Sequence, residues 1–483
     1  MKRSALVAFV LGATTVFAFA PFEIFPLPLL TLALLFGLWR RADSARTSAV
    51  LGFAWGLGLF GAGVSWVYVS MHDVGGMAVP LAAIATLAFC VLLAAFPGAA
   101  GFAYGRLRGG TAWRDAVLAA GVWTLAEWLR GWLLTGFPWL SIGYSQTPPS
   151  PLAGFAPLVG VYGVGLLVAL LAALCGTAWR NWRPWLALLA VCVLGLGFRQ
   201  IAWTEPVGEP VSISLLQGNI PQSIKWEPER LPLSIESYRR LAQAHPAQIT
   251  VLPETAMPTL FDAIPAEVLA DLTRHGDVLI GSAIAGGNGG YGNGAIAVSP
   301  NRPIQVYTKV HLVPFGEFVP PGFDWFFGLV NIPMSGFTPG KRGQPALNVA
   351  GQRLAINICY EDLFGNEIAA ALPAASLLVN LSNTAWFGDS LAQPQHLQIA
   401  RLRAMETGRP IVRATNTGMT AAIAADGAVI AALPPFVESA LTVSVTGYQG
   451  TTPYVRLGDA AAVLLALLAC LPALGQRRRQ AMR

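Results

Sequence analysis

Residues 354–362 read Leu-Ala-Ile-Asn-Ile-Cys-Tyr-Glu-Asp, and they predict the β-strand around which the polar half of the chain is built. Leu354, Ile356 and Ile358 alternate with small or polar residues, a pattern typical of a half-buried strand. Cys359 follows at the strand end, where a rigid sheet can hold a thiol towards a cleft. Because a thiolate is a strong nucleophile, Cys359 is a candidate nucleophile; the alternative is a small buried core residue.

The composition indicates a membrane protein that also carries a polar domain. Of 483 residues, 54% are hydrophobic and 12% are charged, whereas soluble domains have about 25% charged residues. The length leaves room for a soluble domain of about 250 residues with its own core. The net charge of +6 comes from basic residues that flank apolar runs. This arrangement sets membrane topology and argues against a nucleic-acid partner.

The cysteines fall into two groups. Four lie inside apolar runs, where they pass for small hydrophobic residues: Cys90, Cys175, Cys192 and Cys470. Cys359 is the only cysteine in the polar part, and the sequence near it has no second Cys or His at metal-ligand spacing. If the polar domain lies outside the cytoplasm, in an oxidising compartment, a lone thiol there indicates a functional use.

Eight apolar segments predict membrane-spanning helices. They are residues 5–20, 27–39, 48–70, 77–104, 115–134, 155–178, 184–202 and 457–475. The first two are short for a bilayer core of ~30 Å. Met1-Lys2-Arg3 and Ala18-Phe19-Ala20 flank an apolar run, as in a signal peptide. Pro21 disfavours cleavage after this run, so we expect an uncleaved anchor.

The basic residues predict the orientation of these spans. With the N-terminus inside the cell, the inside segments hold Lys2, Arg3, Arg40, Arg41, Arg46, Arg106, Arg108, Arg114, Arg180, Arg183, Arg477, Arg478, Arg479 and Arg483. The outside loops near 21–26, 71–76 and 135–154 hold no Lys or Arg. We therefore expect a seven-span domain (1–202), an outer domain (203–455), and an eighth helix with a basic tail (456–483). In a bacterium this places both termini in the cytoplasm and the outer domain in the periplasm, at the inner membrane.

One pair of ionisable residues lies within a predicted span. Glu127 and Arg130 stand at i and i+3 of the fifth span, so they can meet on one helix face. Ionisable groups inside a membrane are candidate functional residues. A mutual structural pair is the alternative interpretation.

The polar segment has the pattern of a layered α/β domain. Expected strands are 211–219, 249–252, 278–284, 292–299, 304–310, 354–359, 376–381 and 411–414, with a hairpin at 421–432. Expected helices are 231–243, 267–275 and 395–406. Strands that alternate with helices favour stacked layers.

Three of these strands end at or near a side chain that can take part in catalysis: Glu254, Lys309 and Cys359. A carboxylate beside a thiol can act as general base and then as general acid. A lysine ammonium can stabilise a thiolate and the oxyanion of a tetrahedral intermediate. The three types suffice for acyl transfer through a thioester. Singly, Glu254 can be a solvated loop carboxylate and Lys309 an edge-strand lysine.

The motifs around these residues resemble the nitrilase superfamily. Pro253-Glu254, the run from Lys309 to Glu317 and Cys359-Tyr360-Glu361 are similar to its three blocks, in that order. Residues 380–383 and 386–388 are similar to the segment downstream of its nucleophile. With seven spans before this domain and one after it, almost the whole chain resembles the bacterial apolipoprotein N-acyltransferase family.

The resemblance implies a helical membrane domain followed by an αββα sandwich. It implies Cys359 as nucleophile, Glu254 as general base and Lys309 as transition-state stabiliser. It adds Glu317 and Glu361 as supporting carboxylates, Tyr360 beside the nucleophile and Trp226 on the substrate side. Structural anchoring is the alternative role of Glu317 and Glu361, and Trp226 can be a surface aromatic. The expected partners are a phospholipid donor, a diacylated lipoprotein acceptor and the bilayer, with no metal or organic cofactor and a monomeric chain.

The stretch from Phe315 to Phe337 is apolar but interrupted by Pro and Gly, so it is unsuited to a span. We expect a lid or membrane-dipping arm, with Phe326 and Phe327 contacting substrate. Packing over the core is the alternative.

The predicted function is ping-pong acyl transfer. Cys359 takes an acyl chain from a glycerophospholipid, and the α-amino group of a diacylglyceryl-cysteine lipoprotein then accepts it. Two alternatives stay open. One is a membrane-anchored amidase of nitrilase type, in which water resolves the thioester. The other is a membrane transport or binding protein with an inactive domain; the absence of a charge series in the spans argues against ion transport.

Overall fold

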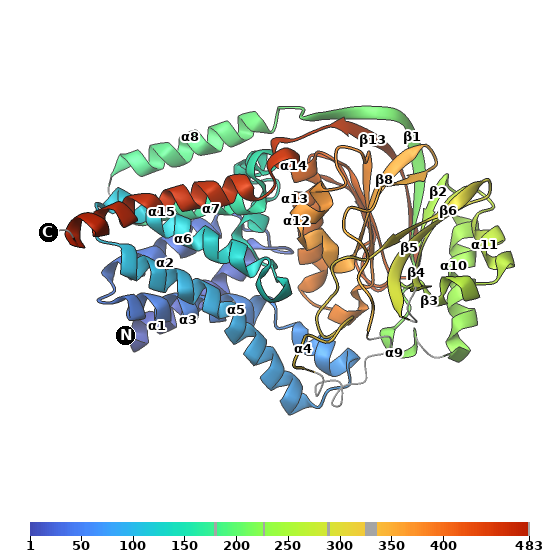
Figure 1. Ribbon diagram of the computed structural model, residues 1–483, viewed down its shortest axis with the longest axis horizontal. Helices are drawn as coiled ribbons and strands as arrows, with labels where there is room; N and C mark the ends of the chain where they lie inside the picture. Colours follow the sequence, from blue (N-terminus) through green and yellow to red (C-terminus); the bar gives the residue numbers. More distant parts are fainter. Residues whose placement is uncertain (178–180, 226–227, 287–289, 324–335, 482–483) are drawn as a thin grey trace. The chain divides into compact units, whose positions relative to one another are not determined.

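The computed structural model describes residues 1–483 except 178–180, 226–227, 287–289, 324–335 and 482–483. The chain forms two compact units (Figure 1). The helical unit comprises residues 1–68, 80–202 and 456–483, and the sheet unit comprises residues 69–79 and 203–455. Residues 69–79, which were predicted to belong to the seven-span domain (1–202), therefore group with the sheet unit.

Each of the eight predicted apolar segments contains a helix. These are α1 (Lys2–Thr15), α2 (Leu27–Arg41), α3 (Ala45–Gly63), α5 (Val79–Leu107), α6 (Ala112–Arg130), α7 (Ala156–Thr177), α8 (Trp182–Phe198) and α15 (Ala460–Ala481). Helices α1 and α3 pack with their backbones in close approach. A Cβ at Gly12 would lie 1.8 Å from the Trp55 carbonyl oxygen, and one at Gly58 would lie 2.0 Å from that of Phe9. Small residues allow such packing between apolar helices.

Among the described residues, two helical segments are long and apolar enough to cross a membrane. They are Val79–Leu107 and Pro151–Gly176, and Ala45–Gly63 with Val67–Val74 is a third if this pair forms one span. Helix α1 has 14 residues and α2 has 15, so each rises about 21–23 Å, less than the ~30 Å of a bilayer core. The protein is a membrane protein, and the eight-span topology stays a prediction.

Glu127 and Arg130 both hold one loop within the helical unit. Ile142 donates its main-chain N–H to Glu127 Oε1 at 2.9 Å. Arg130 donates to the carbonyl oxygens of Phe137 and Trp139. These bonds satisfy main-chain groups in an irregular segment, so the two charged side chains have a structural role in anchoring residues 137–142.

Two sheets form the centre of the sheet unit. The first runs in the order β13 (Ser439–Gly450), β1 (Thr204–Gln217), β2 (Ile249–Val251), β4 (Asp277–Ala285), β5 (Tyr291–Ser299) and β6 (Arg302–Thr308), and β3 (Met257–Leu260) pairs with β4. The second runs in the order β12 (Val429–Ala432), β11 (Ala421–Ile423), β10 (Ile411–Thr415), β9 (Leu377–Ser382), β8 (Gln352–Ile358) and β7 (Leu347–Val349). The central strands β1, β2 and β4 are parallel, as are β8, β9 and β10.

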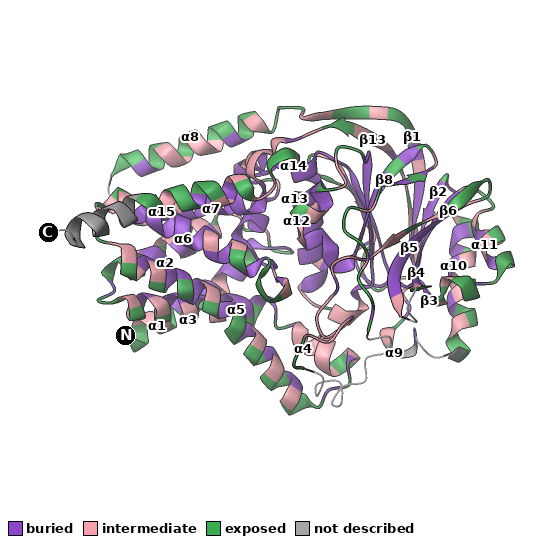
Figure 2. Cartoon of the chain, in the orientation of Figure 1, coloured by how far each residue is buried: buried purple, intermediate pink, exposed green. Residues whose placement is uncertain are grey.

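The two sheets pack face to face and are covered by helices on their outer faces (Figure 1). The shared core contains Ile213 and Val251 from the first sheet, and Ile356 and Val379 from the second. Helices α10 (Leu231–Ala244) and α11 (Ala266–Leu272) cover the first sheet, and α12 (Gly365–Ala369) and α13 (Ala392–Thr407) cover the second. Figure 2 shows both sheets largely buried between these helices. The predicted αββα sandwich is confirmed.

The predicted strands and helices of this unit are present, most of them within a few residues of their expected bounds, but β1 begins at Thr204 rather than at 211. The sequence analysis did not predict β13, although Leu441, Val443 and Val445 alternate and face the core. This strand pairs antiparallel with β1 along Val211–Gln217. A strand from the end of the domain therefore pairs with its first strand.

Candidate active site

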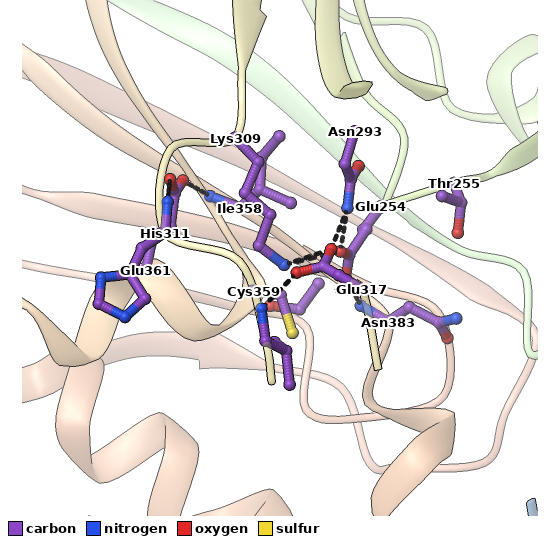
Figure 3. Close-up of polar contacts among 12 residues, drawn as sticks. Glu254, Thr255, Asn293, Lys309, His311, Glu317, Ile358, Cys359, Glu361 and Asn383 are labelled. Carbon is purple, nitrogen blue, oxygen red and sulfur yellow. Dashed lines mark hydrogen bonds and ion pairs between the residues drawn. The ribbon is translucent and has the colours of Figure 1, made fainter. Parts of the chain in front are cut away.

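The ends of strands from both sheets bring the predicted residues together at one end of the sandwich (Figure 3). Glu254 follows β2, Lys309 directly follows β6, and Cys359 directly follows β8. All three are buried, with exposures of 7%, 1% and 8%. The carboxyl ends of parallel strands meet at one sheet edge, which explains how residues about 50 positions apart converge.

Glu254, Asn293, Lys309 and Glu317 form a carboxylate cluster. Lys309 Nζ lies 3.3 Å from Glu254 Oε1 and 2.9 Å from Glu317 Oε1. Asn293, from β5, donates Nδ2 to the same two oxygens at 2.7 and 2.8 Å. One ammonium and one amide therefore hold two carboxylates (Figure 3).

The charges in this cluster favour ionised side chains. Burial raises the pKa of Glu254, but Lys309, Asn293 and the Asn383 main-chain N–H outweigh burial, so this pKa lies below its ordinary value. Burial lowers the pKa of Lys309, and the carboxylates of Glu254 and Glu317 reverse this effect, so its pKa is raised. Asn383 N–H donates to Glu254 Oε2 at 2.8 Å. Glu254 is thus held as a carboxylate that can accept a proton.

Cys359 sits on a tight turn beside this cluster. Its φ of +53° lies in the left-handed region, which is rare for residues other than glycine. Such strain often occurs where the structure presents a reactive side chain. Burial, followed by the charge of Glu254, holds the pKa of the Cys359 thiol well above its ordinary value, and Lys309 opposes them. The resting residue is therefore a protonated thiol next to a carboxylate.

Glu361 fixes the main chain on either side of the site. Its carboxylate accepts from the N–H groups of Ile358 at 2.7 Å, Val310 at 2.7 Å and His311 at 3.1 Å. Tyr307 also donates its hydroxyl to it at 3.0 Å. Glu361 thereby ties the residues after Lys309 to the strand that carries Cys359, and it supports both from a distance.

Asp362, His396 and Arg413 form an arginine cluster behind the nucleophile turn. His396 Nε2 lies 2.8 Å from Asp362 Oδ1, and Arg413 Nη2 lies 3.1 Å from His396 Nδ1. Arginine only donates, so Nδ1 accepts and the neutral imidazole donates its Nε2–H to Asp362. Burial lowers the pKa of His396, in agreement with this neutral form. The cluster links the turn to α13 and β10.

The remaining predicted residues have different outcomes. Tyr360 is buried, and its ring lies 5.8 Å from that of His311 and 5.2 Å from that of Phe364. Trp226, Phe326 and Phe327 lie outside the described residues. Within the described part of the predicted lid, the rings of Phe315 and Phe323 are in contact at 5.3 Å.

Several polar residues of the site were not predicted from the sequence: Asn293, Lys225, His396 and Arg413. Asn293 lies in the predicted strand 292–299 and is the third residue of β5, but no role was predicted for its side chain. Arg413 stands among apolar residues in β10, and a charged residue in a buried strand was the available signal. In the described part of the chain, no group of three His, Cys, Asp or Glu side chains is arranged to hold a metal ion.

Comparison with known proteins gives consistent matches over both units. Residues 11–174 match the apolipoprotein N-acyltransferase N-terminal domain, and residues 212–454 match the carbon-nitrogen hydrolase family. Apolipoprotein N-acyltransferase of Nitrosomonas europaea is 48% identical over 98% of each chain. The enzyme of the same name from Ralstonia nicotianae is 45% identical over 99% of this chain and 94% of its own. A solved amidase from Nesterenkonia sp. is 19% identical, covers 53% of this chain and 95% of its own, and has a TM-score of 0.38.

Proposed function

This chain belongs to the apolipoprotein N-acyltransferase family and is an acyltransferase, and from that membership we propose a two-step transfer through Cys359. The donor is a glycerophospholipid, and the acceptor is the α-amino group of a diacylglyceryl-cysteine lipoprotein. The observation that carries the proposal is the buried thiol of Cys359, on a strained turn beside the carboxylate cluster.

In the first step, Glu254 takes the thiol proton while the Cys359 sulfur attacks the carbonyl carbon of the phospholipid ester. The carbonyl oxygen becomes an oxyanion, which the Lys309 ammonium stabilises. When the intermediate collapses, the ester C–O bond breaks and Glu254 returns the proton to the leaving alkoxide. The products are a thioester on Cys359 and a lysophospholipid.

In the second step, the neutral α-amine of the lipoprotein attacks the thioester carbon. Glu254 takes a proton from the attacking nitrogen, and the carbon–sulfur bond breaks. The departing sulfur recovers that proton from Glu254. An amide forms, the thiol is regenerated, and Glu254 is again ionised for the next cycle.

Glu317 has a supporting part in this scheme. It contacts Lys309 Nζ at 2.9 Å and accepts from the Val313 main-chain N–H at 2.7 Å. The first contact orients the ammonium, and the second holds the loop that follows Lys309. Glu317 therefore positions Lys309, whereas Glu254 exchanges protons.

The proposed topology has eight spans in the bacterial inner membrane, with both termini in the cytoplasm and residues 203–455 on the periplasmic face. The absence of Lys and Arg from the predicted outside loops supports it. The test is labelling with a membrane-impermeant maleimide. Ala285→Cys should be labelled in intact spheroplasts and Thr111→Cys only after permeabilisation, with the unsubstituted protein as control. The reverse pattern contradicts the orientation.

The reaction is tested by the intact mass of the purified protein after incubation with vesicles of one phospholipid of defined acyl length. We expect the mass to rise by one acyl chain in the native protein and to stay unchanged in Cys359→Ala. Adding a diacylglyceryl-cysteine peptide should move that chain to the peptide amine. Release as free fatty acid instead indicates a hydrolase, and no mass gain by the native protein contradicts the thioester mechanism.

A further inference from the structure

Lys225 is a second buried lysine beside Glu254, the proposed base. The two-step mechanism gives it no role. Lys225, the last residue of α9 (Gln222–Lys225), is 1% exposed. Its Nζ donates to Thr255 Oγ1 at 2.7 Å and to the main-chain carbonyl of Glu254 at 3.3 Å. Lysine is rarely buried without a strong local reason, because the ammonium loses its hydration. Lys225 therefore has a role at the turn that carries Glu254.

This turn has a strained backbone. Thr255 has a φ of +47°, which is an outlier for a β-branched residue. Strand β4 approaches the same turn closely at Gly281. A Cβ at Gly281 would lie 2.2 Å from the Pro253 carbonyl oxygen and 2.7 Å from Glu254 Cα. Strand β4 thus packs directly against the turn, and Lys225 holds the two residues that emerge from it. Figure 3 shows Thr255 next to Glu254, at the right of the cluster.

The same short helix, α9, also contacts Asn383, whose main-chain N–H donates to the Glu254 carboxylate. Asn383 donates its side-chain Nδ2 to Gln222 Oε1 at 2.8 Å and its main-chain N–H to Glu254 Oε2 at 2.8 Å. Gln222 and Lys225 are about one helical turn apart in α9. Gln222 contacts Glu254 through Asn383, and Lys225 contacts Glu254 and Thr255 directly. Lys309 contacts only the carboxylate end of Glu254.

We propose that Lys225 is a positioning residue for the general base: its ammonium fixes the Glu254–Thr255 turn, and its charge helps to keep Glu254 ionised. The inference rests on the proposed function, in which Glu254 exchanges the proton. Burial lowers the pKa of Lys225 to about 7, and the Glu254 charge opposes this shift. Lys309 and Glu317 are the other titratable groups of the carboxylate cluster, with Cys359 beside it and Glu361 and Asp362 on the same turn as Cys359. Of these, Lys309 acts on Glu254 with the same sign as Lys225.

The test is the rate of acyl-enzyme formation against pH, followed by intact mass, in full-length Lys225→Met. Without the neighbouring cation, protonation of Glu254 becomes easier, so the acid limb of the profile should move about one unit to higher pH. At a pH below that limb, acylation should be about tenfold slower. The phospholipid concentration at half-maximal rate should stay within about twofold, because the change affects a step after binding.

Lys341→Met is the matched control, since Lys341 is exposed in the same unit. A merely structural lysine predicts a lower thermal midpoint with an unchanged profile per folded molecule, and this result overturns the inference. Thr255→Val keeps the β-branched shape and removes the acceptor oxygen. If Lys225→Met does not fold, Thr255→Val decides the question: slowed acylation supports the inference, and a native rate overturns it.

Glu254→Gln separates this inference from the proposed function. If Glu254→Gln forms the acyl-enzyme at the native rate, the base assignment fails and the role of Lys225 fails with it. If Glu254→Gln is inactive while Lys225→Met has the native rate and pH profile, the proposed function stands and only the role of Lys225 is wrong.

Discussion

The carboxylate cluster and the arginine cluster lie next to the same nucleophile, and they differ in how their charged side chains are paired. Glu254 and Glu317 share the Lys309 ammonium. In the arginine cluster, Arg413 is matched by Asp362, with Arg413 Nη1 at 3.5 Å from Asp362 Oδ2 and neutral His396 between them. The proposed base thus shares the Lys309 ammonium with a second carboxylate, whereas Asp362 is paired one to one with Arg413.

This difference has an energetic consequence. Removing one member of a balanced buried pair leaves an uncompensated charge and costs about 3–5 kcal/mol. An active-site carboxylate is placed for catalysis rather than for stability, so its removal should change stability little while activity is lost. The two clusters are therefore expected to respond to substitution in opposite ways.

The largest effect should follow removal of the nucleophile or the base. Cys359→Ala should form no acyl-enzyme, and Glu254→Gln should slow its formation by about 10²–10⁴-fold, the usual contribution of general acid–base catalysis. Thermal unfolding in detergent should be close to native for both. Glu267→Gln, on exposed α11, is the control for the Glu254 variant. Native turnover by either active-site variant excludes the assigned role.

Lys309→Arg should reduce acylation by about 10²–10³-fold, as for loss of an oxyanion donor. The planar guanidinium cannot replace a compact ammonium that contacts two carboxylate oxygens at 3.3 and 2.9 Å. Single-turnover mass spectrometry measures the rate. A rate near that of the native enzyme would mean that only a general positive charge is needed there.

Arg413→Met should show the reverse pattern. Losing the guanidinium leaves the buried Asp362 carboxylate without its counter-charge, although His396 still donates to it, so the free energy of unfolding should fall by about 3–5 kcal/mol. Molecules that remain folded should still acylate at a rate within about tenfold of native, because Arg413 does not exchange protons in the reaction. Thermal unfolding and acylation per folded molecule measure these two quantities. A stable but inactive variant would place Arg413 in the chemistry.

The smallest effect is a change in the pH dependence of thiol alkylation. Because burial and Glu254 raise the pKa of Cys359, its alkylation by iodoacetamide should keep rising beyond pH 9, without a plateau near neutrality. In Glu254→Gln the opposing charge is gone, so the thiol pKa falls and the curve moves to lower pH. Cys359→Ala corrects for the four other thiols. A plateau near pH 7 in the native enzyme would mean a resting thiolate.

Much of the site could be predicted because its three central residues end predicted strands. Alternation in residues 354–358 places Cys359 at a strand end, and the same reasoning applies to Glu254 and Lys309. The ordered motifs then identified the family. Tyr360, Glu317 and Glu361 were also predicted as site residues. Their contacts could not be assigned, since Glu361 accepts from Val310 and His311, about 50 residues away.

Asn293, Lys225 and the arginine cluster could not be predicted in the same way. Asn293 stands between Gly292 and Gly294, a local signal that equally suits a turn. Its function depends on the placement of β5 beside β6, which brings its amide to two carboxylates on other segments. His396 and Arg413 lie on a helix and a strand that meet Asp362 only after the second sheet has formed.

The sequence by itself determined the apolar helices, the layered domain and the strand ends that carry Glu254, Lys309 and Cys359. These features depend on local periodicity and backbone preference, which neighbouring residues encode. Only the tertiary structure decided that Lys309 contacts both Glu254 and Glu317, and that Arg413 pairs with Asp362. Hydrogen bonds and ion pairs require atoms within about 3–4 Å, and strand order and sheet packing bring distant segments to that range.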